Sequence, residues 1–156
     1  MATDINWTTS AFEELTNEDL YAILKLRCDV FVVEQNCPYP ELDDKDQQSY
    51  HMAGKKDGQL VAYARLIPPG ISYQEASIGR VVTAPQARGA GSGRQLMENA
   101  IAEVWRLFNV TEIQIGAQQY LDAFYTSLGF RQVGEMYLED GIPHIHMILR
   151  KSAFGQ

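Results

Sequence analysis

Three stretches of the chain repeat apolar residues at the spacing of an amphipathic helix, in which residues three and four positions apart share a face. The middle stretch has the longest stripe, made of Met97, Ile101, Val104, Trp105 and Phe108. The first runs to about residue 33, and its apolar face also carries one cation, Arg27. The other residues on this face are Leu20, Ile23, Leu24, Val30 and Phe31. The third is short and consists of Leu121, Phe124, Tyr125 and Leu128. We expect Thr16 to cap the first helix, and Gly129 with Phe130 to end the third.

The remaining hydrophobic pattern predicts short strands, at 5–9, 51–53, 60–66, 78–83, 111–116, 132–138 and 145–149. The strands 51–53 and 60–66 flank Lys56-Asp57-Gly58-Gln59, which is a hairpin signal. The middle helix joins the strand 78–83 to the strand 111–116. A strand–helix–strand connection predicts that these two strands run parallel.

Length and composition indicate one globular domain, 1–156, with a core of about 5–150. The chain has 156 residues, of which 46% are hydrophobic and 21% charged, so it can bury a substantial core. A net charge of −7 argues against nucleic acid as a partner and leans toward cationic small molecules. No apolar run approaches the ~20 residues of a membrane span, and no signal-peptide pattern opens the chain. Two cysteines without secretory context make a reducing cytoplasm the expected location.

A glycine-rich turn precedes the middle helix, with the sequence Arg88-Gly89-Ala90-Gly91-Ser92-Gly93-Arg94. A strand followed by such a turn and a helix start presents free backbone N–H groups and the positive end of a helix dipole, which favour an anion. No acid lies between Glu75 and Glu98, whereas Arg80 lies in this window with Arg88 and Arg94. The positive window favours a phosphate-bearing ligand. A P-loop is excluded, because it would need a Lys-Ser/Thr pair after the last glycine. The glycine spacing fits a dinucleotide site poorly. A glycine turn that binds no ligand is the remaining alternative.

The turn also resembles a family signature. Arg88-x-x-Gly91-x-Gly93, behind Val-Val-Thr-Ala-Pro, is similar to the pyrophosphate-binding motif of the GNAT superfamily of acyl-CoA N-acyltransferases. The run Phe124-Tyr125-Thr126-Ser127-Leu128-Gly129-Phe130 resembles a second element of that superfamily. The segments 27–39 and 139–144 resemble its ElaA-type bacterial subgroup. Four motifs in order, over nearly the whole chain, are far more specific than any one of them.

The resemblance implies a single-domain α+β fold, with a mixed central sheet of about seven strands and helices on both faces. In this fold the strands at 77–83 and 111–116 splay apart, and the pantetheine arm of the co-substrate lies in the gap. The expected co-substrate is acetyl-CoA, without a metal. The residues expected to bind it are Val81, Val82 and Thr83 through the backbone, then Arg88, Gly89, Ala90, Gly91, Ser92, Gly93, Arg94 and Tyr125.

The implied reaction is direct transfer of an acetyl group to an amine. In the resembled family the tyrosine at position 125 lies near the thioester sulfur, and a phenol with a pKa of ~10 is protonated at neutral pH, so Tyr125 is the expected acid. An ammonium must lose its proton before it attacks, and Glu34 and His144 are the candidate bases. The acceptor stays open among polyamine, amino sugar, amino acid and peptide amine. A non-catalytic acyl-CoA sensor is the alternative function, and homodimer formation is left open.

Five other groups carry candidate chemistry. Arg27 is either a buried, paired cation, which we favour, or a site residue; Arg65 is either structural or faces the cleft. The acidic run Glu41, Asp43, Asp44 and Asp46 is expected to be a solvated loop, with attraction of an amine as the alternative. Cys28 and Cys37 are expected to be small buried thiols. His144 and His146 share one side of a strand, where His144 is the better candidate for the acceptor pocket and His146 is expected to be structural.

Overall fold

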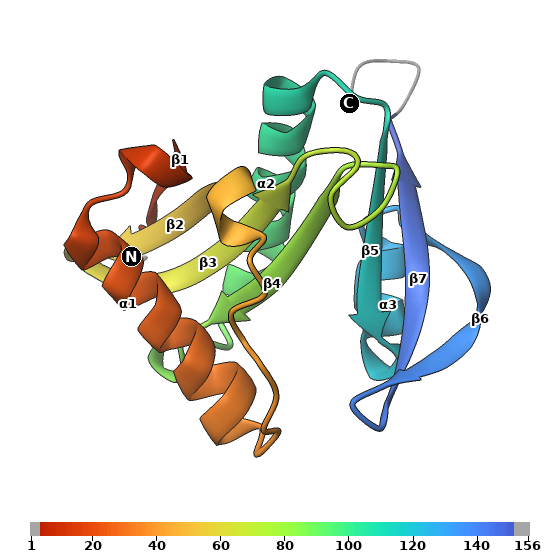
Figure 1. Ribbon diagram of the computed structural model, residues 1–156, viewed down its shortest axis with the longest axis horizontal. Helices are drawn as coiled ribbons and strands as arrows, with labels where there is room; N and C mark the ends of the chain where they lie inside the picture. The colour runs from red at the N-terminus through yellow and green to blue at the C-terminus, as the bar shows by residue number, and fades with distance from the viewer. Residues whose placement is uncertain (1–3, 152–156) are drawn as a thin grey trace.

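The computed structural model describes residues 4–151, in which seven strands and three α-helices follow one another in the order of Figure 1. The strands are β1 (Asn6–Ala11), β2 (Tyr50–Lys56), β3 (Gln59–Ile67), β4 (Ser77–Thr83), β5 (Glu112–Gln118), β6 (Arg131–Glu139) and β7 (Ile142–Arg150). The helices are α1 (Asn17–Arg27), α2 (Ser92–Phe108) and α3 (Asp122–Ser127). A π-helical segment, Cys28–Glu34, continues α1.

The strands form two antiparallel sheets, one with the order β1-β2-β3-β4 and one with the order β5-β7-β6. The sheets meet where Ala76 forms a parallel bridge with Ile113, and the Gln114 amide donates to the Ala76 carbonyl at 2.9 Å. Beyond this bridge β4 and β5 diverge, as Figure 1 shows. The predicted single-domain α+β fold and its splay are confirmed. The predicted mixed sheet is divided into two sheets, because a single parallel bridge is all that joins them in the described residues.

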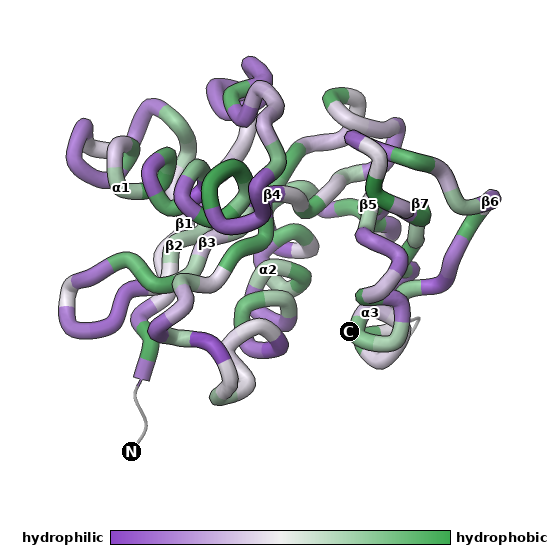
Figure 2. Tube along the Cα trace, turned by 90° about the horizontal axis from the view of Figure 1, so that it is seen from below, coloured by the Kyte–Doolittle hydropathy of each residue, from purple (hydrophilic) through white to green (hydrophobic). Residues whose placement is uncertain are grey.

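Helices cover both faces of the first sheet, with α1 in front of it and α2 behind it in Figure 1. Hydrophobic and hydrophilic positions alternate along α2 in Figure 2, as expected of an amphipathic helix. Met97 and Val104 are fully buried, as the stripe predicts, whereas Ile101 and Trp105 are only partly buried. Burying an aliphatic side chain contributes about 1.5–3 kcal/mol, so this face accounts for much of the attachment of α2.

Local signals in the sequence place the ends of several elements. The Thr16 hydroxyl accepts a hydrogen bond from the Asp19 amide at 3.0 Å, which confirms the predicted cap of α1. Gly129 ends α3 with φ +104°, and the Phe130 amide donates to the Tyr125 carbonyl at 3.1 Å. Asp57 and Gly58 both have positive φ in the β2–β3 turn, as the hairpin signal predicts.

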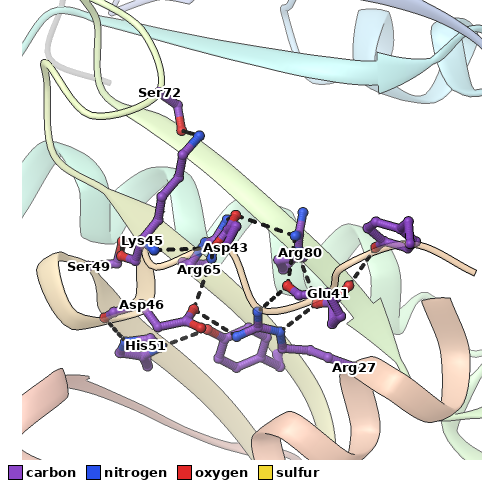
Figure 3. A network of polar contacts seen from close by, with 12 residues as sticks. Arg27, Glu41, Asp43, Lys45, Asp46, Ser49, His51, Arg65, Ser72 and Arg80 are labelled. Carbon is purple, nitrogen blue, oxygen red and sulfur yellow. Dashed lines mark hydrogen bonds and ion pairs between the residues drawn. The ribbon is translucent and has the colours of Figure 1, made fainter. Parts of the chain in front are cut away.

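The prediction of a solvated acidic loop between residues 36 and 49 was wrong for Glu41 and Asp46, whereas Asp44 is exposed. Glu41 and Asp46 are only 4% and 6% exposed. They pair with three arginines from elements that surround the loop: Arg27 of α1 and Arg65 of β3, which are buried, and Arg80 of β4, which is partly exposed. Figure 3 shows these side chains converging under the loop. Burial of the carboxylates follows from this pairing, since the cationic partners offset the loss of hydration.

The prediction for the cysteines was only partly right. Cys28 and Cys37 are unpaired thiols, and both are partly exposed instead of fully buried. Within residues 4–151, no helix combines the length and the apolar character needed to cross a membrane.

Candidate active site

A cavity of about 310 Å³ lies where β4 and β5 separate. Its walls are residues 78–83 of β4 and 115–118 of β5, and the buried side chains of Met97 in α2 and Tyr125 in α3 also line it. The π-helical segment and the loop after it, together with the turn between β6 and β7, also contribute to the lining. Ligand sites typically have this size and lie between separated elements. The cavity therefore opens at the predicted splay.

A β-bulge shapes the β4 wall of the cavity. Residues 63 and 65 of β3 pair with residues 82 and 79 of β4, so that Arg80 and Val81 together oppose a single residue of β3. Arg80 has φ +52°, which costs about 1 kcal/mol or more for a residue with a Cβ. A bulge leaves an extra residue outside the ladder, so backbone groups near Val81 are available to a ligand.

The Arg80 side chain is held from the acidic loop. Its Nε donates to the Glu41 carboxylate at 2.7 Å, its Nη2 donates to the Glu41 carbonyl at 2.9 Å, and the guanidinium lies over the Tyr39 ring at 5.7 Å. The buried network in Figure 3 thus stabilises the strained residue at the cavity wall. Arg27 and Arg65 are structural members of this network, which confirms the favoured interpretation for Arg27.

The glycine turn has the geometry of an anion site. Gly89 and Gly91 have φ of +95° and +77°, and Gly91 is the N-cap of α2. Ser92 donates its hydroxyl to the Ala87 carbonyl, which closes the turn. Within residues 4–151 the backbone N–H groups from Gly89 to Arg94 donate to no protein acceptor. The turn therefore presents unpaired donors at the positive end of a 17-residue helix.

The arginines of the positive window are neutralised, contrary to the charge argument from the sequence. Arg80 pairs with Glu41, Arg94 Nε lies 3.2 Å from Glu98, and Arg88 forms two hydrogen bonds of 2.6 and 2.8 Å with Glu34. The partners of Arg80 and Arg88 are distant in sequence and could not be read from the window. The attraction for an anion at this turn rests mainly on the backbone.

Tyr125 of α3 lines the cavity and is buried. Its side chain packs edge-on against Phe124 and Phe130, with ring centroids 5.1 and 5.8 Å away, and the residue is 8% exposed. Its hydroxyl has no hydrogen-bond partner among the described residues. Burial raises the pKa of Tyr125 to about 12, so the phenol stays protonated at physiological pH.

His144 of β7 also lines the cavity. Its Nδ1–H donates to the Ile142 carbonyl at 2.8 Å, which leaves the Nε2 lone pair free. The Glu139 carboxylate lies 4.0 Å from Nε2. His146 stacks on Tyr137 at 4.4 Å and does not line the cavity, as expected for a structural residue. The described residues contain no group of three or more potential metal ligands.

The structure does not place Glu34 in the cavity with Tyr125 and His144. Its side chain is 44% exposed, it does not line the cavity, and the paired Arg88 lowers its pKa. Sequence reasoning missed three residues beside the cavity: Tyr73, Gly116 and Tyr137. An isolated glycine inside a strand signals a close approach by other groups, and this signal was available at Gly116.

Comparison with known proteins decides the family. The model of the acetyltransferase (GNAT) domain matches residues 15–151. The chain belongs to the GNAT family. Protein ElaA of Escherichia coli is 43% identical over 145 residues, which are 92% of this chain and 95% of ElaA. The UPF0039 protein sll0451 of Synechocystis is 44% identical over 148 residues, which are 94% of this chain and 96% of that protein.

Solved structures agree with this assignment. The crystal structure of an acyl-CoA N-acyltransferase from Pseudomonas aeruginosa is 46% identical, with a TM-score of 0.90 over 94% of this chain and 99% of that one. The crystal structure of Escherichia coli ElaA is 41% identical, with a TM-score of 0.88, and the match covers 94% of this chain and 100% of that one. The predicted resemblance to ElaA-like GNAT proteins is confirmed. These findings support an N-acyltransferase with an acyl-CoA co-substrate.

Proposed function

We propose that this GNAT protein transfers an acetyl group from acetyl-CoA to a primary amine by direct attack. The observation that carries the proposal is Tyr125, a protonated phenol that lies in the cavity without a protein partner. A buried hydroxyl usually finds a partner within the fold, so a free one in a cavity is suited to a ligand. A sensor that only binds acyl-CoA would have no use for a proton donor at this place.

Acetyl-CoA is proposed to enter from the glycine turn. Its diphosphate would accept hydrogen bonds from the unpaired N–H groups between Gly89 and Arg94, next to Arg88. Its pantetheine arm would lie along the backbone of residues 81–83, in the gap between β4 and β5. A main-chain N–H near Val81 or Val82 would polarise the thioester carbonyl, as donors do in an oxyanion hole.

The proposed step forms one bond and breaks one. The lone pair of the neutral amine attacks the carbonyl carbon, the C–S bond breaks, and Tyr125 gives its proton to the departing thiolate. The amine proton leaves to His144 Nε2, directly or through water, and the products are an amide and CoA. We assign the base to His144 instead of Glu34, because His144 lines the cavity with Nδ1 used by the Ile142 carbonyl, whereas Arg88 holds the Glu34 carboxylate outside it.

Replacing Tyr125 by Phe tests the acid role. The release of free thiol from acetyl-CoA, measured with a panel of amines, should fall by about 10²-fold or more, while CoA affinity measured by calorimetry stays the same. His144→Gln should lose most activity at pH values where the amine is charged and regain part of it as the pH rises. Turnover by Tyr125→Phe equal to that of the native chain would refute the proposed mechanism.

CoA binding without thiol release, with every amine, would instead support the acyl-CoA sensor. A thermal shift with CoA alone separates both functions from a chain that binds no coenzyme. The unpaired thiols of Cys28 and Cys37 fit the reducing cytoplasm in which we expect the protein to act.

A further inference from the structure

The charged groups along the cavity are unevenly neutralised. Arg80 and Arg88 both line the cavity, and both pair with carboxylates, as described above. Glu139 and Asp140, at the turn between β6 and β7, also line it. Neither is paired with a lysine or arginine among residues 4–151, and the one cationic partner within 4.0 Å of Glu139 is His144, if protonated. The free charge of the lining is therefore negative and lies beside His144, the proposed base.

Two tyrosine side chains lie next to the cavity lining, against the histidines of β7 and beside Gly116. The Tyr137 ring lies 5.7 Å from the His144 ring and stacks on His146 at 4.4 Å. Tyr73, from the loop between β3 and β4, meets the His146 ring edge-on at 5.5 Å. This loop lies beside β5 and β7 in Figure 1. Tyrosine faces and carboxylates together are the groups that recognise organic cations.

The two tyrosine hydroxyls converge on Gly116 of β5, which lines the cavity. A Cβ at Gly116 would lie 2.7 Å from the Tyr137 oxygen and 2.9 Å from the Tyr73 oxygen. Neither hydroxyl has a hydrogen-bond partner among the described residues. Burial, and the charge of Glu139, raise the pKa of both phenols, that of Tyr137 to about 12, so both stay neutral. Their oxygen lone pairs are available to accept hydrogen bonds from an ammonium group.

We propose that Glu139, Tyr137 and Tyr73 form a subsite for a second positive group of the acceptor, so that the substrate is a diamine or polyamine. The inference rests on the proposed function. The amine that attacks must be neutral, and His144 serves that nitrogen. A carboxylate with two free phenol oxygens binds the opposite form, a charged ammonium, and thus holds the far end of the molecule while its near end reacts.

Three amines of one length test the subsite: 1,4-diaminobutane, 1-aminobutane and 4-aminobutanoate. With acetyl-CoA and the native chain, kcat/KM should be highest for the diamine, by about tenfold or more over the monoamine, and lowest for the amino acid; tenfold corresponds to ~1.4 kcal/mol. Repeating the series with 1,3-diaminopropane and 1,5-diaminopentane covers other spans.

Glu139→Gln and Tyr137→Phe should each remove most of the preference for the diamine, by raising the KM for the diamine more than the KM for 1-aminobutane. Glu135→Gln is the matched control, because Glu135 is an exposed carboxylate on the same strand that does not line the cavity. A thermal shift with CoA checks that each variant is folded. Equal kcat/KM for diamine and monoamine would overturn the subsite and leave the acetyltransferase intact. Absence of thiol release with every amine would instead count against the proposed function.

Discussion

Glu41 is the central acid of the buried network, and its removal should destabilise the fold severely. Its Oε2 lies 2.8 Å from Arg27 Nε and 2.7 Å from Arg80 Nε, and its Oε1 accepts from the Tyr39 hydroxyl. The Glu41 side chain is 2% exposed and that of Arg27 is fully buried. Glu41→Gln keeps the size of the side chain but leaves two guanidinium groups without their shared charge. Removing one partner of a buried pair costs about 3–5 kcal/mol.

Glu34→Gln is the matched control. It makes the same chemical change at a carboxylate that also pairs with an arginine, but the side chains of Glu34 and Arg88 are 44% and 40% exposed. Water screens such a pair and hydrates whichever partner remains, so its loss should be far smaller. The two substitutions thus differ mainly in burial.

Urea unfolding followed by tryptophan fluorescence measures both variants against the native chain. Glu41→Gln should lower the free energy of unfolding by about 3 kcal/mol or more. A chain of this length loses about 2–4 °C in Tm per kcal/mol, so its Tm should fall by roughly 6–12 °C. Equal losses for Glu41→Gln and Glu34→Gln would show that burial of the network does not determine its strength, and would refute the reasoning.

Three further changes address single positions. Burial lowers the pKa of His51, whose Nε2–H donates to the Asp46 carbonyl. The contribution of His51 to stability should therefore be complete above its unfolded pKa of ~6.5. It should be lost as the pH falls from there through the lower pKa of the folded state. The urea midpoint should therefore drop between pH 7.5 and pH 5.5, and His51→Gln should flatten this drop. Gly116→Ala would place a methyl group within 3 Å of two hydroxyl oxygens; we expect a loss of ~1–3 kcal/mol in the same assay, and an unchanged midpoint would contradict the close approach. In Gly91→Ala the new Cβ meets no atom within 4 Å, but the alanine must adopt φ +77°. Calorimetry should therefore find weaker CoA binding, or the Tm should be a few degrees lower. If neither effect is seen, the turn tolerates other conformations.

Much of the fold was predictable because its signals are local. The cap at Thr16, the end of α3 at Gly129 and the turn at Asp57-Gly58 depend on residues within a few positions of each other. The stripe on α2 reflects the period of the helix itself. Four ordered motifs were enough to indicate the family, and the family implied the splay between β4 and β5.

The pairing of charges was not predictable in this way. From the adjacent sequence alone, a run of acidic residues is predicted to be a solvated loop. Glu41 is buried because Arg27 and Arg80 reach it from 14 and 39 residues away, and Arg88 is neutralised by Glu34 at a separation of 54 residues. Such contacts depend on how the elements pack, and they decided which arginines are available to a ligand.

The sequence by itself determined the elements, their order, the family and the glycine turn that starts α2, because each of these depends on short-range spacing and conformation. The tertiary structure decided which charges cancel, that His144 and not Glu34 lies at the cavity, and that the hydroxyls of Tyr73 and Tyr137 meet over Gly116. These are properties of groups brought together from distant parts of the chain, where burial and proximity set the strength of every charge and hydrogen bond.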